Sequence, residues 1–97
     1  MAKKIVVIKN DGNFEQMKAF EFLKNYPDVE FEYATEIIPE GTEMSERFLQ
    51  METQGPDSFE FDDAYINTLK SANIIVTFFS MVPSCVFEAG NCEAVVI

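Results

Sequence analysis

The stretch SANIIVTFFSMVPSCVFEAGNCEAVVI, residues 71–97, decides the fold. It predicts a strand, a turn, a short helix and a second strand. Residues 73–79 form an apolar run rich in β-branched and aromatic side chains, typical of a parallel strand buried on both faces. Ser80 is a predicted cap for the helix, and Pro83 suits its first turn because a proline lacks the N–H that would be unpaired there. Residues 93–97 begin another apolar strand. Because the strand at residues 73–79 is expected to be buried on both faces, helices are expected on both sides of the sheet.

Upstream of this stretch, strands and helices alternate. Residues 4–9 are predicted to form a strand of the central type, because residues 5–8 are continuously apolar between two lysines. Residues 13–25 have helical spacing, with Asn13 as the predicted cap. Residues 29–35 alternate apolar and acidic side chains, which indicates a half-exposed strand near the edge of the sheet. The sequence therefore begins with a strand, a helix and a second strand.

Two further helices are predicted in the middle of the chain. Ser45 is the predicted cap of a short helix that ends before Gly55-Pro56, and Asp62 or Asp63 caps another that ends near residue 70. The alternation of strands and helices predicts the α/β class, with a doubly wound parallel sheet and right-handed crossovers. The first strand is expected at the centre, with the second on one side and the third on the other.

Ligands of such sheets bind where the winding direction reverses, at the carboxyl ends of the first and third strands. Here those ends are residues 10–13 and 77–83, which should face each other across one crevice. Hydrogen-bonding side chains and an apolar wall are predicted there. The candidate substrate-binding residues are Asn10, Asp11, Thr77, Phe78, Phe79, Ser80, Met81 and Val82.

Three of these candidates have a second interpretation. Asp11 could act as a general acid or base, although a role in the turn and helix cap is the more common one for aspartate. Phe78 and Phe79 point to opposite faces of the strand, so at least one ring is expected in the core. Gly12 is the single glycine of the first turn, so a glycine-rich phosphate cradle is excluded.

Composition narrows the possible functions further. A chain of 97 residues with 47% apolar residues is expected to fold as one small domain. The net charge of -10 comes mostly from residues 28–63, where Arg47 is the only base. Such a surface repels phosphate backbones and argues against nucleic-acid binding, and its simplest interpretation is a solvated acidic face.

Cysteine and histidine usage excludes several chemistries. The chain has no histidine, and Cys85 and Cys92 lie seven residues apart without a second pair. The usual zinc spacings, a redox Cys-x-x-C motif and Ser-His or Cys-His catalysis are therefore not expected, and no metal ligand is predicted. No apolar run is long enough to span a bilayer, and the N-terminus leads directly into a strand, so a cytoplasmic protein without membrane contact is predicted.

The second half of the chain resembles the first domain of the D-isomer-specific 2-hydroxyacid dehydrogenases, the family that includes phosphoglycerate dehydrogenase. The matching pieces are Gly55-Pro56-Asp57, the strand at residues 71–76, Val82-Pro83, the helix end at residues 86–89 and the strand at residues 94–97. The resemblance implies a flavodoxin-like substrate-binding domain with three layers, joined to a second domain that binds NAD or NADP. A small 2-hydroxy or 2-oxo acid would bind in the cleft between the two domains.

The family's catalytic Arg, Glu or Asp, and His match positions downstream of residue 97, as does its glycine-rich NAD turn. By this resemblance the chain is a partial substrate-binding domain, residues 1–97, that contributes the cleft side of an oxidoreductase without binding NAD itself. An apolar face left by the missing strand and helix would favour a homodimer. The alternative is a complete flavodoxin-like binding or regulatory module that uses the same crevice, or a dimerising domain without ligand.

Overall fold

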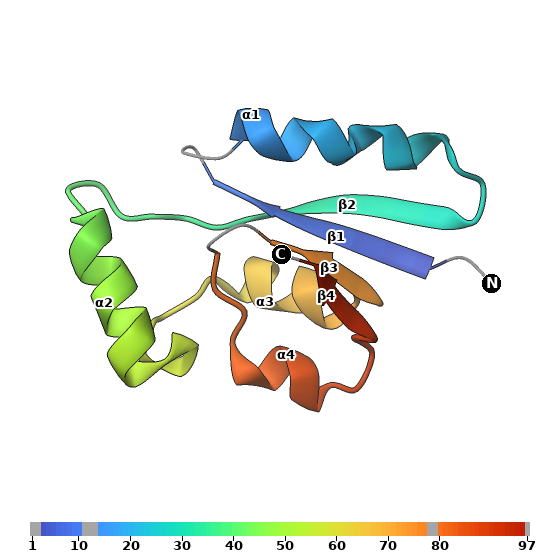
Figure 1. The fold of residues 1–97 in the computed structure, drawn as a ribbon. Helices are drawn as coiled ribbons and strands as arrows, with labels where there is room; N and C mark the ends of the chain where they lie inside the picture. The colour runs from blue at the N-terminus through green and yellow to red at the C-terminus, as the bar shows by residue number, and fades with distance from the viewer. Residues whose placement is uncertain (1–2, 11–13, 78–79, 97) are drawn as a thin grey trace.

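A computed structural model describes residues 3–10, 14–77 and 80–96. Four parallel strands form one sheet in the order β2-β1-β3-β4 (Figure 1). The strands are β1 (Lys3–Lys9), β2 (Val29–Thr35), β3 (Ile74–Val76) and β4 (Ala94–Val96). The first strand lies between the second and the third, which confirms the predicted α/β fold with a doubly wound parallel sheet of flavodoxin-like type. It also confirms β2 as an edge strand.

The apolar run of β1 supplies both faces of the core. Val6 and Ile8 are fully buried on one face, where they pack with Leu69. Ile5 and Val7 point to the other face and pack with Met17. Because side chains of a strand alternate between the two faces, a continuous apolar run is needed when both faces are covered.

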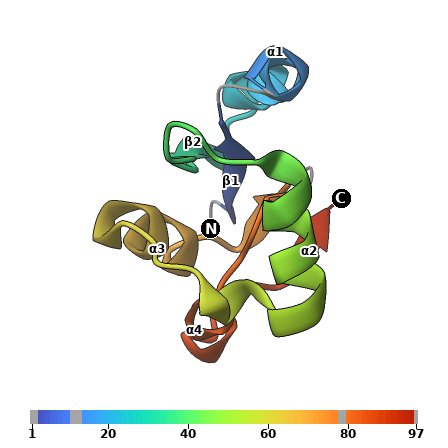
Figure 2. The same cartoon turned by 90° about the vertical axis from the view of Figure 1, so that its left-hand side faces the viewer.

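Helices cover these two faces as expected (Figure 1). One layer consists of α1 (Phe14–Met17) and the 3-10 helix η1 (Lys18–Asn25), and the other contains α3 (Asp63–Lys70) and α4 (Ser84–Glu88). The remaining helix, α2 (Met44–Gln54), is followed by a short 3-10 turn, η2 (Pro56–Ser58), and lies beyond the carboxyl ends of the strands (Figures 1 and 2). The carboxyl end of the sheet therefore faces α2.

The first crossover differs from its prediction in winding. A helix over residues 13–25 is predicted, and the helical segment does end at Asn25, but eight of its residues form a 3-10 helix. The predicted cap Asn13 lies outside the described residues. Apolar periodicity over so few residues does not separate hydrogen bonds to the third residue from hydrogen bonds to the fourth, so it predicts the element and not its pitch.

Two of the predicted helix caps are wrong. Ser45 lies inside α2, which follows Glu43. Ser80 does not cap α4; that helix begins at Ser84, whose N–H and hydroxyl both donate to the carboxylate of Asp57, at 2.8 and 2.6 Å. These bonds lower the pKa of Asp57 below its ordinary value. A partner 27 residues away replaces the local cap, and local rules cannot find it.

The cap of α3 is correctly predicted. Asp62 precedes the helix, and its side chain accepts a hydrogen bond from the N–H of Ala64 at 3.2 Å. The helix then buries Tyr65 and Leu69, which are four residues apart and share a face. Asp62 therefore fixes the start of the helix that brings Tyr65 to the carboxyl end of the sheet.

Candidate functional site

The predicted site residues that the structure describes lie in two loops at the carboxyl end of the sheet. Asn10 follows β1, whereas Thr77, Ser80, Met81 and Val82 follow β3. The hydroxyl of Thr77 donates to the carbonyl oxygen of Ser80 at 3.2 Å and so closes the second loop on itself.

The candidates Asp11, Phe78 and Phe79 lie outside the described residues. The proposed crevice is therefore defined by its remaining members. Two of these, Met81 and Val82, are predicted members of an apolar wall. The Met81 side chain is only 2% exposed and Val82 packs on the core cluster, so both side chains contribute to the core.

Both backbone groups of Met81 are held by side chains. Its N–H donates to a carboxylate oxygen of Glu36 at 3.0 Å, and its carbonyl oxygen accepts from the hydroxyl of Tyr65 at 2.6 Å. Both hydrogen bonds are buried. Since a buried backbone group without a partner is costly, these two side chains replace the strand partner that Met81 lacks.

Glu36 is the side chain that joins the two loops. It directly follows β2, and its own N–H donates to the carbonyl oxygen of Lys9 at 2.7 Å. One carboxylate oxygen accepts from Met81, and the other accepts from the side-chain amide of Asn10 at 3.1 Å. The carboxylate thus connects the ends of β1, β2 and β3 at a single point.

The cation nearest to this carboxylate comes from α2. A guanidinium nitrogen of Arg47 lies 3.9 Å from Glu36, and the two side chains are only 10% and 4% exposed. The guanidinium also lies over the ring of Phe59, 4.9 Å from its centroid. Burying a charge is costly unless it is paired and hydrogen-bonded, so the carboxylate needs this set of partners.

Tyr65 is held in its neutral form. Burial raises the pKa of its hydroxyl above the ordinary value, the negative charge of Glu36 raises it further, and Arg47 opposes the shift. A neutral hydroxyl keeps the proton that it donates to Met81. The charge of Glu36 therefore supports the second bond of the loop as well as the first.

One buried polar atom of the second loop has no hydrogen-bond partner among the described residues. The hydroxyl oxygen of Ser80 is buried and has no hydrogen-bond partner within residues 3–10, 14–77 and 80–96. Buried polar groups are nearly always paired, and an unpaired one calls for an explanation. Thr77 and Met81 make the hydrogen bonds described above, whereas the Ser80 hydroxyl remains an unused donor and acceptor among the described residues.

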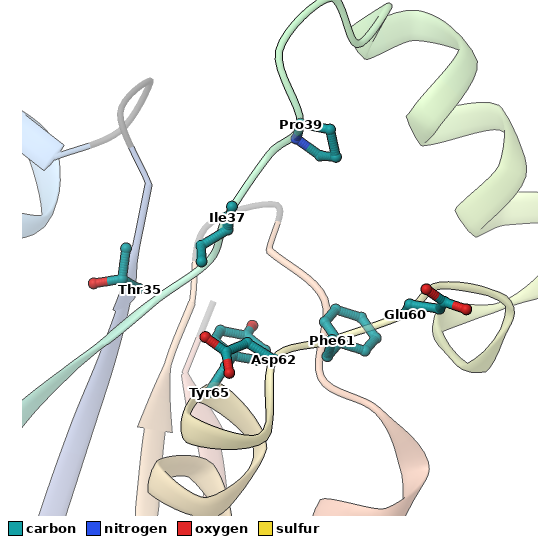
Figure 3. A pocket seen from close by; sticks show the side chains of 7 residues that line it. All are labelled: Thr35, Ile37, Pro39, Glu60, Phe61, Asp62 and Tyr65. Atoms are coloured by element: carbon teal, nitrogen blue, oxygen red, sulfur yellow. The ribbon is translucent and has the colours of Figure 1, made fainter.

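Two pockets border this end of the sheet. One, of about 380 Å³, is lined by Lys9, Asn10, Phe14, Glu15 and Thr35. The other, of about 340 Å³, is shown in Figure 3 and is lined by Thr35, Ile37, Pro39, Glu60, Phe61, Asp62 and Tyr65. The rings of Phe61 and Tyr65 are stacked in it, with centroids 5.5 Å apart. Tyr65 therefore lines a pocket with its ring and holds Met81 with its hydroxyl.

Comparison with known proteins found no matching family model, curated protein or solved structure. Among the described residues, no cluster of three or more cysteine, aspartate or glutamate side chains is arranged to hold a metal ion. Within the same residues, no helix has the length and apolar character needed to cross a bilayer. The site is therefore interpreted from its own geometry.

Three residues of this site are absent from the sequence prediction: Glu36, Arg47 and Tyr65. Each left a signal. Arg47 is the only base in the acidic segment 28–63, and a single base in such a segment suggests a specific partner. Glu36 lies two residues after Ala34, so an extended chain places it on the same face as that buried residue.

Proposed function

We propose that this chain forms the substrate-cleft side of an NAD(P)-dependent oxidoreductase that acts on a D-2-hydroxy acid. In this proposal the chain binds the small 2-hydroxy or 2-oxo acid, while the catalytic residues and the NAD(P) site belong to a further part of the polypeptide. The support is the parallel sheet with β1 between β2 and β3, together with the sequence resemblance to the 2-hydroxyacid dehydrogenases.

The observation that carries the proposal is the Ser80–Met81 segment, whose backbone is held by hydrogen bonds and whose Ser80 hydroxyl has no partner among the described residues. A substrate carboxylate accepts hydrogen bonds, and Ser80 Oγ is a donor without a partner among the described residues. The carbonyl of Ser80 and both backbone groups of Met81 are already bonded, so binding does not have to order this segment. A site that is ordered in advance binds a small ligand at a lower entropic cost.

The test is an assay of the complete polypeptide that the gene encodes. We expect NADH or NADPH to be oxidised with at least one member of a panel of 2-oxo acids. Ser80→Ala should raise KM by about tenfold because it removes one hydrogen bond to an anion. Ser80→Trp should abolish binding by filling the site, whereas Glu88→Trp, at an exposed position of α4, should leave KM unchanged.

Two outcomes would contradict the proposal. The first is a complete polypeptide that oxidises neither cofactor with any 2-oxo acid. The second is an active polypeptide in which both Ser80 variants keep the original KM, since this would remove the loop from the site. Binding of a 2-oxo acid by the isolated chain without any turnover would favour the alternative of a flavodoxin-like binding module.

A homodimer and a cytoplasmic location belong to the same proposal. The open edge of the sheet supports the dimer, because all three residues of β4 are exposed, including Val95 and Val96 at 37% and 46%. An exposed apolar edge strand can pair with another copy. Sedimentation of the chain and of a Val95→Lys variant tests this, and a monomer at all concentrations would contradict the dimer.

A further inference from the structure

We propose that Glu36 is a positioning residue that fixes the Ser80–Met81 segment, and that Arg47 makes this fixation depend on the seating of α2. The first part concerns the conformation of the loop and is independent of the chemistry at the site. The second part, a regulation of substrate binding through α2, rests on the proposed function.

The argument begins with the backbone of Met81. Its N–H and its carbonyl are held from two different elements, by Glu36 after β2 and by Tyr65 of α3. The adjacent hydroxyl of Ser80 has no partner among the described residues. Hydrogen bonds therefore hold the carbonyl of Ser80 and both backbone groups of Met81, whereas the buried Ser80 hydroxyl has no partner among the described residues.

Charge makes Glu36 the most important of these contacts. Its carboxylate accepts two hydrogen bonds from neutral donors, Asn10 and Met81, and a buried anion needs more than these. Arg47 supplies the positive charge at 3.9 Å. If this charge moved away, the carboxylate would be drawn toward water, and the N–H of Met81 would lose its acceptor.

Arg47 contributes polar contacts to the position of α2. No residue of α2 is fully buried, although the Arg47 side chain is only 10% exposed, and Met44 and Leu49 are large apolar side chains that remain exposed. The guanidinium of Arg47 connects the helix to Glu36 and to the ring of Phe59. A helix without a fully buried residue opens at a lower free energy than the core. A displacement of α2 is therefore the most accessible way to withdraw the cation.

These contacts thus connect α2 with the segment that carries the Ser80 hydroxyl, which has no partner among the described residues. A molecule that binds α2 in its present position would stabilise the Ser80–Met81 segment, and one that displaces α2 would destabilise it. By linkage, a substrate that binds the fixed loop would in turn stabilise the seat of α2. The coupling runs through one two-state element, the Arg47–Glu36 contact.

The test compares three variants of the protein by amide hydrogen exchange. Glu36→Ala removes the acceptor. Glu36→Gln keeps an oxygen for Met81, and its amide can donate to the oxygen of a flipped Asn10 side chain. Arg47→Met removes the cation and keeps the apolar contact with Phe59. Glu46→Ala, at an exposed position of the same helix, is the control.

The exchange rate of the Met81 amide is measured relative to amides of β1, which report opening of the core. We expect the ratio to rise about tenfold or more in Glu36→Ala, because one charge-assisted hydrogen bond is lost. In Arg47→Met it should rise severalfold. Glu36→Gln keeps the acceptor but loses the charge, so its ratio should lie between those of the wild type and Glu36→Ala. A general loss of stability would change the Met81 and β1 amides together and would leave the ratio unchanged. The Glu46→Ala control should match the wild type.

The proposal fails if the relative exchange of Met81 is the same in Arg47→Met as in the wild type, or if Glu36→Gln is as fast as Glu36→Ala. If Glu36→Ala does not fold, the other two variants still decide. In the complete polypeptide, Arg47→Met should also raise KM for a 2-oxo acid without a matching change in kcat. Absence of turnover in the wild type would overturn the proposed function, whereas an unresponsive Met81 would overturn the positioning role alone.

Discussion

The two ends of the sheet carry polar contacts of opposite character. At the amino end, Lys3 and Glu93 form an ion pair at 2.6 Å, but more than half of each side chain is exposed. At the carboxyl end, Glu36 and Arg47 are almost completely buried and lie 3.9 Å apart. Water solvates the first pair, whereas the protein itself must supply the partners of the second. The Lys3–Glu93 pair, although it is shorter, is therefore expected to contribute less to stability than the Glu36–Arg47 pair.

The largest expected effect comes from removing the buried carboxylate. Glu36→Ala leaves Arg47, Asn10 and the N–H of Met81 without their common partner, which should lower the free energy of unfolding by about 3 kcal/mol. Glu93→Ala is the matched control at the amino end and should cost at most about 0.5 kcal/mol. Urea denaturation of both variants measures the difference. Equal losses of stability in Glu36→Ala and Glu93→Ala would contradict the difference between the buried and the exposed pair.

The next effect concerns the hydroxyl of Tyr65. Tyr65→Phe removes its bond to Met81 and should lower the free energy of unfolding by about 1 kcal/mol at pH 8. Above pH 10 this difference in the free energy of unfolding should shrink. The folded state keeps the Tyr65 proton that the unfolded state releases, because the pKa of Tyr65 is raised on folding. The free energy of unfolding of the wild type therefore falls as the pH rises above 10.

In the phenylalanine variant this fall should be shallower, so the difference between the two proteins should shrink between pH 10 and 12. Tyr33 is the control, because burial and then Glu21 raise its pKa to about 12 at the face covered by α1 and η1. Tyr33→Phe should lessen the alkaline fall without affecting the exchange of the Met81 amide. A parallel pH dependence of the wild type and Tyr65→Phe would contradict the buried, neutral state of Tyr65.

The smallest effect is expected at the amino end. Lys3→Gln removes one side of the exposed pair with Glu93 and should change the free energy of unfolding by about 0.5 kcal/mol or less. Salt should reduce even this difference, since ions screen exposed charges. Urea denaturation at low and high salt measures it. A loss of several kcal/mol would show that this contact is more than a solvated pair.

The sequence predicts most of the sheet because the signals are local. The apolar run of β1, the alternation of β2 and the order of the elements are sufficient to place β1 between β2 and β3. Asp62 also caps α3 as predicted, because its partner Ala64 is two residues away. Local patterns thus predict those parts of the molecule in which the deciding interactions are local as well.

The site was harder to predict because its deciding contacts are distant along the chain. Glu36 and Met81 are 45 residues apart, and Asp57 and Ser84 are 27 apart. In the sequence, Glu36 and Asp57 are two acidic residues among many. Only the packing shows that one of them is buried between three strand ends and that the other caps α4 in place of Ser80. Loops 10–13 and 77–83 were predicted as the site, but not the carboxylate that joins them.

The 3-10 winding of η1 has a consequence for the length of the first crossover. A 3-10 helix rises about 2.0 Å per residue and an α-helix about 1.5 Å, so the four residues of α1 and eight of η1 extend about 22 Å. The seven-residue strand β1 extends about 23 Å. An α-helix of the same twelve residues would extend only about 18 Å. Tight winding thus lets a short segment return along the whole strand, and a version wound entirely as an α-helix would need about three more residues to reach Tyr26.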